Sequence, residues 1–177
     1  MCRMLPKISN YKISYRTFQH LKTAIHKLKN EDVKFGKNFA VIRASGFVYT
    51  LNYSGYINIT KIAHLLDAEK AITALHELIQ IPKNCTGFNV DNITASGNFG
   101  CRVRIVDLKY FFDSNQNLGK FCFRPSSFCG ANIKYPSFGT IIIFDTGSYT
   151  IVGSKTSDQV NQVYHETRKI LDSIRCA

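Results

Sequence analysis

The strongest constraint on the fold of this chain is that one order of helical and extended patterns occurs twice along its 177 residues. Each half reads as an extended run with an asparagine, a helix, a strand that begins at a phenylalanine, a glycine hairpin and a long amphipathic helix. Such agreement in order favours internal duplication over coincidence. The paired landmarks are Asn10 and Asn92, Phe39 and Phe128, and Gly55 and Gly147.

Four segments have helical periodicity, with apolar residues recurring every three or four positions. Pro82 ends the second of them. We expect helices over residues 17–28, 67–81, 106–112 and 157–174. The stripes Phe18/Leu21/Ile25 and Val160/Val163 are interpreted as faces that pack against a sheet.

Extended segments lie between the helices. Two of them flank Tyr53-Ser54-Gly55, and Asp145-Thr146-Gly147 marks a second turn of the hairpin kind. We expect strands over residues 38–43, 47–52, 56–60, 88–96, 132–134, 140–144 and 149–152.

The two halves, residues 8–84 and 85–177, are expected to form one domain over residues 1–177. Each half leaves a sheet face to cover. The economical arrangement is an α+β fold in which two tandem pseudo-symmetric repeats share one continuous curved antiparallel sheet, with the long helices on one face. The other face stays open, and such a face in a basic protein is a candidate nucleic-acid surface.

The chain is basic, with 23 Lys+Arg against 12 Asp+Glu and a formal charge of +11. Residues 1–84 carry 13 Lys+Arg and 5 Asp+Glu, a net charge of +8, and residues 85–177 carry 10 Lys+Arg and 7 Asp+Glu, a net charge of +3. No run of like charge reads as a tail, so the excess is spread over a folded surface. The expected partner is a polyanion, with nucleic acid ahead of an acidic membrane or an acidic protein.

Other classes of function find little support. The six cysteines contain no C-x-x-C pair and the five histidines are scattered, so we expect neither a metal site nor a cofactor. No apolar run has the length of a membrane span, and we expect no membrane partner. His165-Glu166 lacks a second histidine four residues on, and no phosphate loop or nucleophile elbow is present. We therefore expect no enzyme, with a Ser-His-Asp or Cys-His site as the open alternative.

Four motifs of the second half resemble the TATA-box-binding protein family. Asp91-Asn92-Ile93-Thr94 is similar to the family's Gln-Asn-Ile-Val. Phe128-Cys129-Gly130 followed by Lys134 is similar to Phe-Pro-Gly followed by Arg. The run from Ile141 to Gly147 is similar to a strand ending in Phe-x-Ser-Gly. The run from Ile151 to Lys155 is similar to the family's Leu-Thr-Gly-Ala-Lys. The first half matches more loosely, and the whole indicates a divergent member, with a viral factor as one form of it.

The resemblance implies a saddle with helices on its convex face, whose concave face enters the DNA minor groove and bends the duplex. It implies a role in transcription initiation: recognition of TATA or A·T-rich promoters and nucleation of a preinitiation complex with general transcription factors and RNA polymerase machinery. The implied location is the nucleus, or a cytoplasmic replication site for a viral factor. The family's Glu-rich partner loop is basic and polar here, so altered contacts are expected around Arg124 and Ser127.

The resemblance also implies which residues insert between base steps. Phe128 and Phe144 match one wedge pair, and Phe39 matches the first member of the other. Asn52 stands where the fourth phenylalanine is expected, with Tyr53 beside it as an alternative ring. If Asn52 occupies the position, we expect the kink at that end to be weaker.

Further positions match base, floor or phosphate contacts. Asn10 and Asn92 match the two central asparagines that donate to base acceptors. Tyr56 and Ser148 replace lysine at two positions that face a phosphate in the family, so we expect weaker phosphate binding there. The remaining expected DNA-binding residues are Arg43, Thr60, Thr94, Lys134, Val152 and Lys155.

Two alternatives remain beside DNA bending. One is an accessory module of the same fold that binds an RNA–DNA hybrid or a protein. The other is a nucleic-acid-processing enzyme. A strand phenylalanine is also more often a core residue than an exposed one, so the orientation of the three phenylalanines separates these interpretations.

Overall fold

The computed structural model describes residues 5–28, 32–85 and 87–175, which form two compact units. The N-terminal unit is Asn10–Asp91, and the C-terminal unit is Met1–Ser9 together with Asn92–Ala177. Of the six cysteines, Cys2 and Cys176 lie outside the described residues. No helix in the described ranges has both the length and the apolarity to cross a bilayer.

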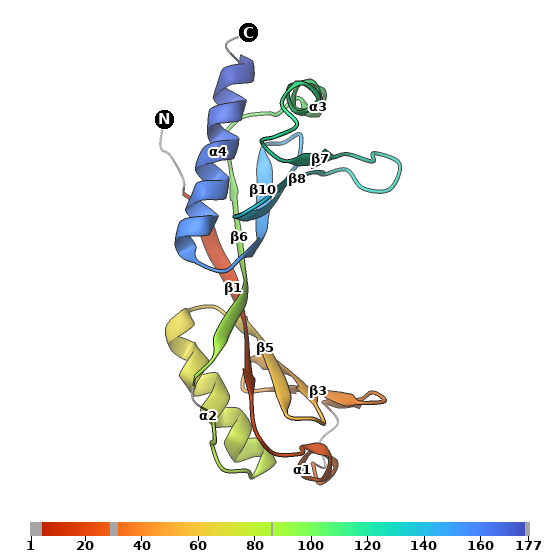
Figure 1. The fold of residues 1–177 in the computed structure, drawn as a ribbon, viewed down its shortest axis with the longest axis vertical. Helices are drawn as coiled ribbons and strands as arrows, with labels where there is room; N and C mark the ends of the chain where they lie inside the picture. The colour runs from red at the N-terminus through yellow and green to blue at the C-terminus, as the bar shows by residue number, and fades with distance from the viewer. Residues whose placement is uncertain (1–4, 29–31, 86, 176–177) are drawn as a thin grey trace. The chain divides into compact units, whose positions relative to one another are not determined.

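The same order of elements, one strand, a helix, four strands and a helix, occurs twice (Figure 1). The first set is β1 (Lys7–Arg16), α1 (Lys22–His26), β2 (Val33–Phe35), β3 (Phe39–Ala44), β4 (Phe47–Asn52), β5 (Tyr56–Ile62) and α2 (Ala68–Ile79), with a 3-10 turn η1 (Leu65–Asp67) before α2. The second set is β6 (Asn89–Asn98), α3 (Ile105–Ser114), β7 (Lys120–Cys122), β8 (Ala131–Tyr135), β9 (Gly139–Ile143), β10 (Ser148–Ser154) and α4 (Ser157–Arg175).

The strands of the N-terminal unit are hydrogen-bonded in the order β2-β3-β4-β5-β1, and those of the C-terminal unit in the order β6-β10-β9-β8-β7. The pairings within each unit are antiparallel. This confirms the expected α+β class and the expected antiparallel sheet. The duplication of the sequence itself and the repeat boundaries at residues 8, 84 and 85 stay predictions.

In the N-terminal unit the core lies between the strands and α2, which is yellow to green in Figure 1. Alternate strand residues such as Leu51, Ile57 and Ile59 are fully buried, and Ile72 and Leu75 of α2 pack with them. The Tyr49 hydroxyl donates a hydrogen bond to the Ala71 carbonyl at 3.2 Å, and burial raises the pKa of Tyr49 to about 12. The phenol therefore stays protonated and ties β4 to the helix.

The C-terminal unit has the same kind of core, with α3 and α4 against its strands. The expected stripe of α4 is buried, as are Ile141, Ile143 and Ile151 of the strands. Thr167 of α4 donates to the Val163 carbonyl, so Tyr135 of β8 is the donor in its 2.9 Å bond to Thr167. Burial raises the pKa of Tyr135 to about 12, which preserves this donor.

The helix expected over residues 17–28 is much shorter than predicted. Only α1 is helical, because the Thr17 N–H bonds to the Gly55 carbonyl and the Leu21 N–H to the Tyr53 carbonyl, both at 2.9 Å. These bonds to the hairpin turn replace intrahelical ones. Phe18 is consequently 85% exposed, and its assignment to a packed helical stripe was wrong.

Strand prediction failed at three strands. The strand β1 covers Lys7–Arg16, beyond the extended run expected around Asn10, and the three-residue edge strands β2 and β7 were not predicted. A three-residue strand is too short to show alternation. The other helices agree with prediction to within two residues at each end.

Glycine is required at both hairpin turns. Gly55 has φ +94°, and a Cβ there would lie 2.3 Å from the Thr17 carbonyl oxygen. Gly147 has φ +81°, and its Cβ would meet the Cys101 carbonyl oxygen. Each turn therefore packs directly against the backbone that follows the first strand of its unit, β1 or β6.

We expect Gly55→Ala to destabilise the protein by about 3 kcal/mol, because both the backbone conformation and the steric contact oppose a Cβ. The matched control is Gly46→Ala, where φ is +82° but no atom lies within 4 Å of the added carbon. The control is expected to cost only about 1 kcal/mol. Urea unfolding measures both, and equal losses would contradict the assigned turn contact.

Candidate nucleic-acid interface

Each unit has one sheet face that no helix covers, because the buried residues alternate with residues that stay accessible. In the N-terminal unit this open face follows from the pairs Val41–Thr50, Thr50–Asn58 and Asn58–Ser14, since directly paired residues point to the same side. It carries Phe39, Val41, Arg43, Val48, Thr50, Asn52, Tyr56, Asn58 and Thr60.

The open face of the C-terminal unit is built in the same way. Asn132, Ile142, Thr150 and Ser96 form one cross-strand row, and Lys134, Thr140 and Val152 form the next. Phe128 and Phe144 lie where β8 begins and β9 ends. Most of these small polar and β-branched residues were not predicted from the sequence. Their positions between buried neighbours, as with Ile142 between Ile141 and Ile143, are the signal that could have found them.

The two asparagines expected to contact bases occupy equivalent positions in their own units. Asn10 Oδ1 accepts a 2.7 Å hydrogen bond from the Lys61 N–H. Asn92 Oδ1 accepts one from the Gly153 N–H. Lys61 and Gly153 have φ of +65° and +84°, and the strand registers shift beside both. Each asparagine therefore holds a β-bulge in its neighbouring strand.

These bonds fix the orientation of both amides. A backbone N–H is a donor only, so the asparagine atom facing it must be the oxygen, and the Nδ2 group is left to donate. Asn92 Nδ2 lies 3.2 Å from Thr94 Oγ1, and both side chains are half-buried. Each open face thus presents an oriented amide donor.

Phe128 and Phe144 form an aromatic pair outside the core, with Phe128 exposed and Phe144 half-buried. Their ring centroids are 5.8 Å apart with an interplanar angle of 69°, and Phe128 is 44% exposed. The Phe128 ring lies over Gly130, where a Cβ would approach its Cε1 atom to 2.6 Å. Neither ring belongs to the core, so both are available to an external partner.

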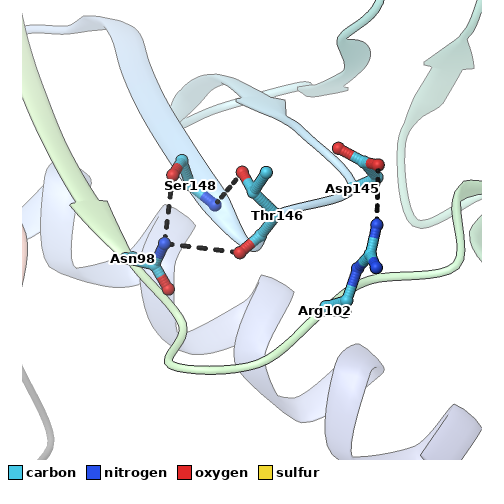
Figure 2. A network of polar contacts seen from close by, with 5 residues as sticks. All are labelled: Asn98, Arg102, Asp145, Thr146 and Ser148. Carbon is cyan, nitrogen blue, oxygen red and sulfur yellow. Dashed lines mark hydrogen bonds and ion pairs between the residues drawn. The ribbon is translucent and has the colours of Figure 1, made fainter.

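The turn after Phe144 is held by the polar network of Figure 2. Asn98 Nδ2 donates to Ser148 Oγ at 3.0 Å and to the Thr146 carbonyl at 3.4 Å, and Arg102 pairs with Asp145 at 3.3 Å. The Phe144 N–H bonds to the Ser148 carbonyl and the Gly147 N–H to the Phe144 carbonyl. Both ends of the turn are thereby fixed next to the Phe144 ring.

The N-terminal unit has a different arrangement at the equivalent turn. The Gly55 N–H bonds to the Asn52 carbonyl, just as Gly147 bonds to Phe144, so Asn52 does occupy the phenylalanine position. Ala40 pairs with Leu51 where Ala131 pairs with Ile143. By this register Phe39 stands at the place of Gly130, and Lys37 at the place of Phe128. Phe39 is still 41% exposed, with its ring over Gly36.

Tyr53 does not replace the missing ring on the open face. It is only 9% exposed, its hydroxyl donates to the Gly36 carbonyl at 3.4 Å, and its ring lies 6.0 Å from that of His26 in α1. Because side chains alternate along a strand, Tyr53 points to the helix side while Asn52 points to the open side. The alternative of a one-residue shift to Tyr53 was wrong.

The expected phosphate-binding residues carry free positive charge. Arg43, Lys134 and Lys155 are exposed and form no ion pair within the described ranges. The observed ion pairs lie instead on helices and turns. One carboxylate, Asp91, accepts a 2.9 Å hydrogen bond from Ser14 Oγ and reduces the positive potential locally. An unpaired cation has its full charge available to a polyanion.

Comparison with known proteins agrees with this geometry. Residues 87–174 match the family model of transcription factor TFIID, also called TATA-binding protein or TBP. The chain belongs to the TBP family. TBP of Methanococcus jannaschii has a similar structure, with a TM-score of 0.78 at 20% sequence identity over 98% of this chain and 100% of that one. No curated protein sequence matched the chain.

The match to the TBP model covers the half in which the sequence motifs were clearest. TBP-family proteins are DNA-binding factors of transcription without enzymatic activity, which supports a DNA-binding role for this chain in general terms. Among the described residues no group of three or more His, Cys, Asp or Glu side chains is placed to hold a metal ion.

The bulge at Lys61 generates a stability prediction. An L-residue at φ +65° is strained, whereas the equivalent bulge has glycine at residue 153. We expect Lys61→Gly to raise the free energy of unfolding by about 0.5–1 kcal/mol, because relief of this strain exceeds the added chain entropy of glycine. Lys61→Ala, which keeps the strain, should stay within about 0.5 kcal/mol of the original. Destabilisation by glycine in urea unfolding would contradict the assigned conformation.

Proposed function

We propose that this protein binds duplex DNA in the minor groove through its open sheet faces and bends the duplex. The observation that carries the proposal is the Phe128–Phe144 pair, two rings outside the core at the end of an open face that also presents an oriented asparagine donor. Apolar rings of this kind insert between base steps and open the minor groove.

The chemistry of the open faces suits A·T-rich DNA. A·T pairs present only acceptors in the minor groove, at adenine N3 and thymine O2. The Nδ2 groups of Asn10 and Asn92 supply donors, and Thr94, Thr60 and Val152 supply small surfaces that fit a groove floor. Arg43, Lys134 and Lys155 supply charge for the phosphates.

The biological role that follows is promoter recognition in transcription initiation. The bent A·T-rich duplex would nucleate a preinitiation complex with general transcription factors and RNA polymerase machinery, in the nucleus. Partner contacts at residues 124–127 differ from the family pattern, since the loop has no acidic residue. Its turn is ordered by the Ser127 and Phe128 N–H groups, which both bond to the Arg124 carbonyl at 3.0 Å and lead directly into the wedge.

Removing either wedge ring tests the proposal. We expect Phe128→Ala and Phe144→Ala to reduce affinity for an A·T-rich duplex by roughly tenfold to a hundredfold, since a ring stacked on a base contributes about 1–3 kcal/mol. Both variants should also reduce the bend, measured as fluorescence transfer between dyes at the duplex ends. Stability should change by only about 1 kcal/mol, because the rings are largely outside the core.

The matched control is Tyr110→Ala, which removes an exposed aromatic ring from α3 on the helix side. It should leave affinity and bending unchanged. A folded protein that does not bend the duplex at low salt would overturn the proposal. Global unfolding of the Phe128 and Phe144 variants would instead show these rings to be structural.

A further inference from the structure

A cross-strand row at the turn end of the N-terminal unit differs in chemistry from its counterpart in the other unit. Phe39 pairs with Asn52, Asn52 lies beside Tyr56 across the Gly55 turn, and Tyr56 pairs with Arg16. Phe39 and Tyr56 are each 41% exposed. An amide therefore sits between two accessible rings, where the C-terminal unit has the phenylalanine Phe144.

The amide of Asn52 is oriented by its neighbour. Asn52 Nδ2 donates to the Tyr56 carbonyl oxygen at 3.3 Å. A carbonyl is an acceptor only, so this bond assigns the nitrogen to the Tyr56 side. Within the described residues Oδ1 of Asn52 accepts no hydrogen bond. The side chain is half-buried on the open face, and the oxygen is the atom left in need of a donor.

The minor groove offers one donor to such an acceptor. A·T and T·A pairs expose only acceptors there, and the exocyclic amino group of guanine is the single base donor. If the row enters the groove, an A·T pair would leave Asn52 Oδ1 desolvated and unpaired, which is unfavourable. A guanine amino group would satisfy it.

We propose that Asn52 makes the N-terminal unit select a G·C base pair at its end of the binding site, with Phe39 and Tyr56 stacking on either side of the contact. The inference rests on the proposed minor-groove binding. Tyr56 thereby stacks on the bases, whereas the lysine that the family has at this position faces a phosphate. The bonds to Lys61 and Gly153 occupy the oxygens of Asn10 and Asn92 and make their amide nitrogens the donors, whereas Asn52 presents an acceptor, so the central contacts still favour A·T pairs.

Selection of a G·C pair at one end of the binding site would fix the orientation in which the duplex is bound. The C-terminal unit has Phe144 at the equivalent position and no side-chain acceptor there. A duplex with guanine near one end of an A·T-rich core would therefore be bound in one orientation, with the guanine at the N-terminal unit.

The experiment compares guanine with inosine, which lacks only the amino group. A single G·C pair is moved stepwise through an A·T-rich duplex, each duplex has an I·C twin, and affinities of the full chain are measured at one salt concentration. At one position near one end we expect G·C to bind about tenfold tighter than I·C. At the central positions I·C should bind as well as G·C or better.

Variants assign the preference to its residue. Asn52→Leu, which keeps the branched shape of the side chain but has no acceptor, and Asn52→Phe, which copies the other unit, should each abolish the preference for guanine. Asn58→Leu, the same change elsewhere on the same face, should keep it.

The outcomes separate the two proposals. Tight binding with equal G·C and I·C affinities at every position would overturn the inference and leave the proposed function intact. A guanine preference that survives Asn52→Leu would also overturn it. No binding to any duplex would overturn both.

Discussion

The structure depends on one-sided burial in its strands. Each strand places alternate residues such as Ile57 and Ile59, or Ile141 and Ile143, against helices, and this fixes both the register and the face that every intervening residue occupies. A slip of one residue would exchange the two faces. Because the helices cover only the buried side, the accessible residues stay on the open face, and the same hydrophobic pattern that stabilises each unit defines the surface that we propose binds DNA.

Two kinds of backbone irregularity shape the open faces. The bulges at Lys61 and Gly153 hold Asn10 and Asn92 by their side-chain oxygens, so the amide nitrogens are the donors, and that of Asn92 donates one bond to Thr94 Oγ1. The turns at Gly55 and Gly147 bring the end of one hairpin strand against the chain that follows the first strand of the set. These elements are equivalent in the two units, while the side chains at the hairpin end, Asn52 and Phe144, are not.

The sequence predicted the fold better than the site. Long periodic elements such as α4 and the hairpin β4–β5 were predicted nearly in full, because the burial of one face requires apolar residues at regular spacing along the sequence. The segment of residues 17–21 was misread as helix because its spacing is helical, while tertiary bonds to the Gly55 turn decide its conformation. The alignment of Phe39 with Phe128 failed because spacing along the chain does not count bulges and loop insertions, whereas strand pairing does. No sequence pattern reveals which atom of an asparagine faces its neighbour, so the orientations of Asn52 and Asn92 required the structure.

The central claim, that the open faces recognise DNA through the minor groove, is tested most directly by exchanging A·T for I·C pairs throughout a bound A·T-rich duplex. This exchange preserves the acceptors of the minor groove and alters the groups of the major groove. If the open faces bind in the minor groove, affinity stays within about twofold of that for the original duplex and the bend is unchanged. A large loss of affinity, with the A·T duplex still bound by the same protein, would place recognition in the major groove and contradict the account.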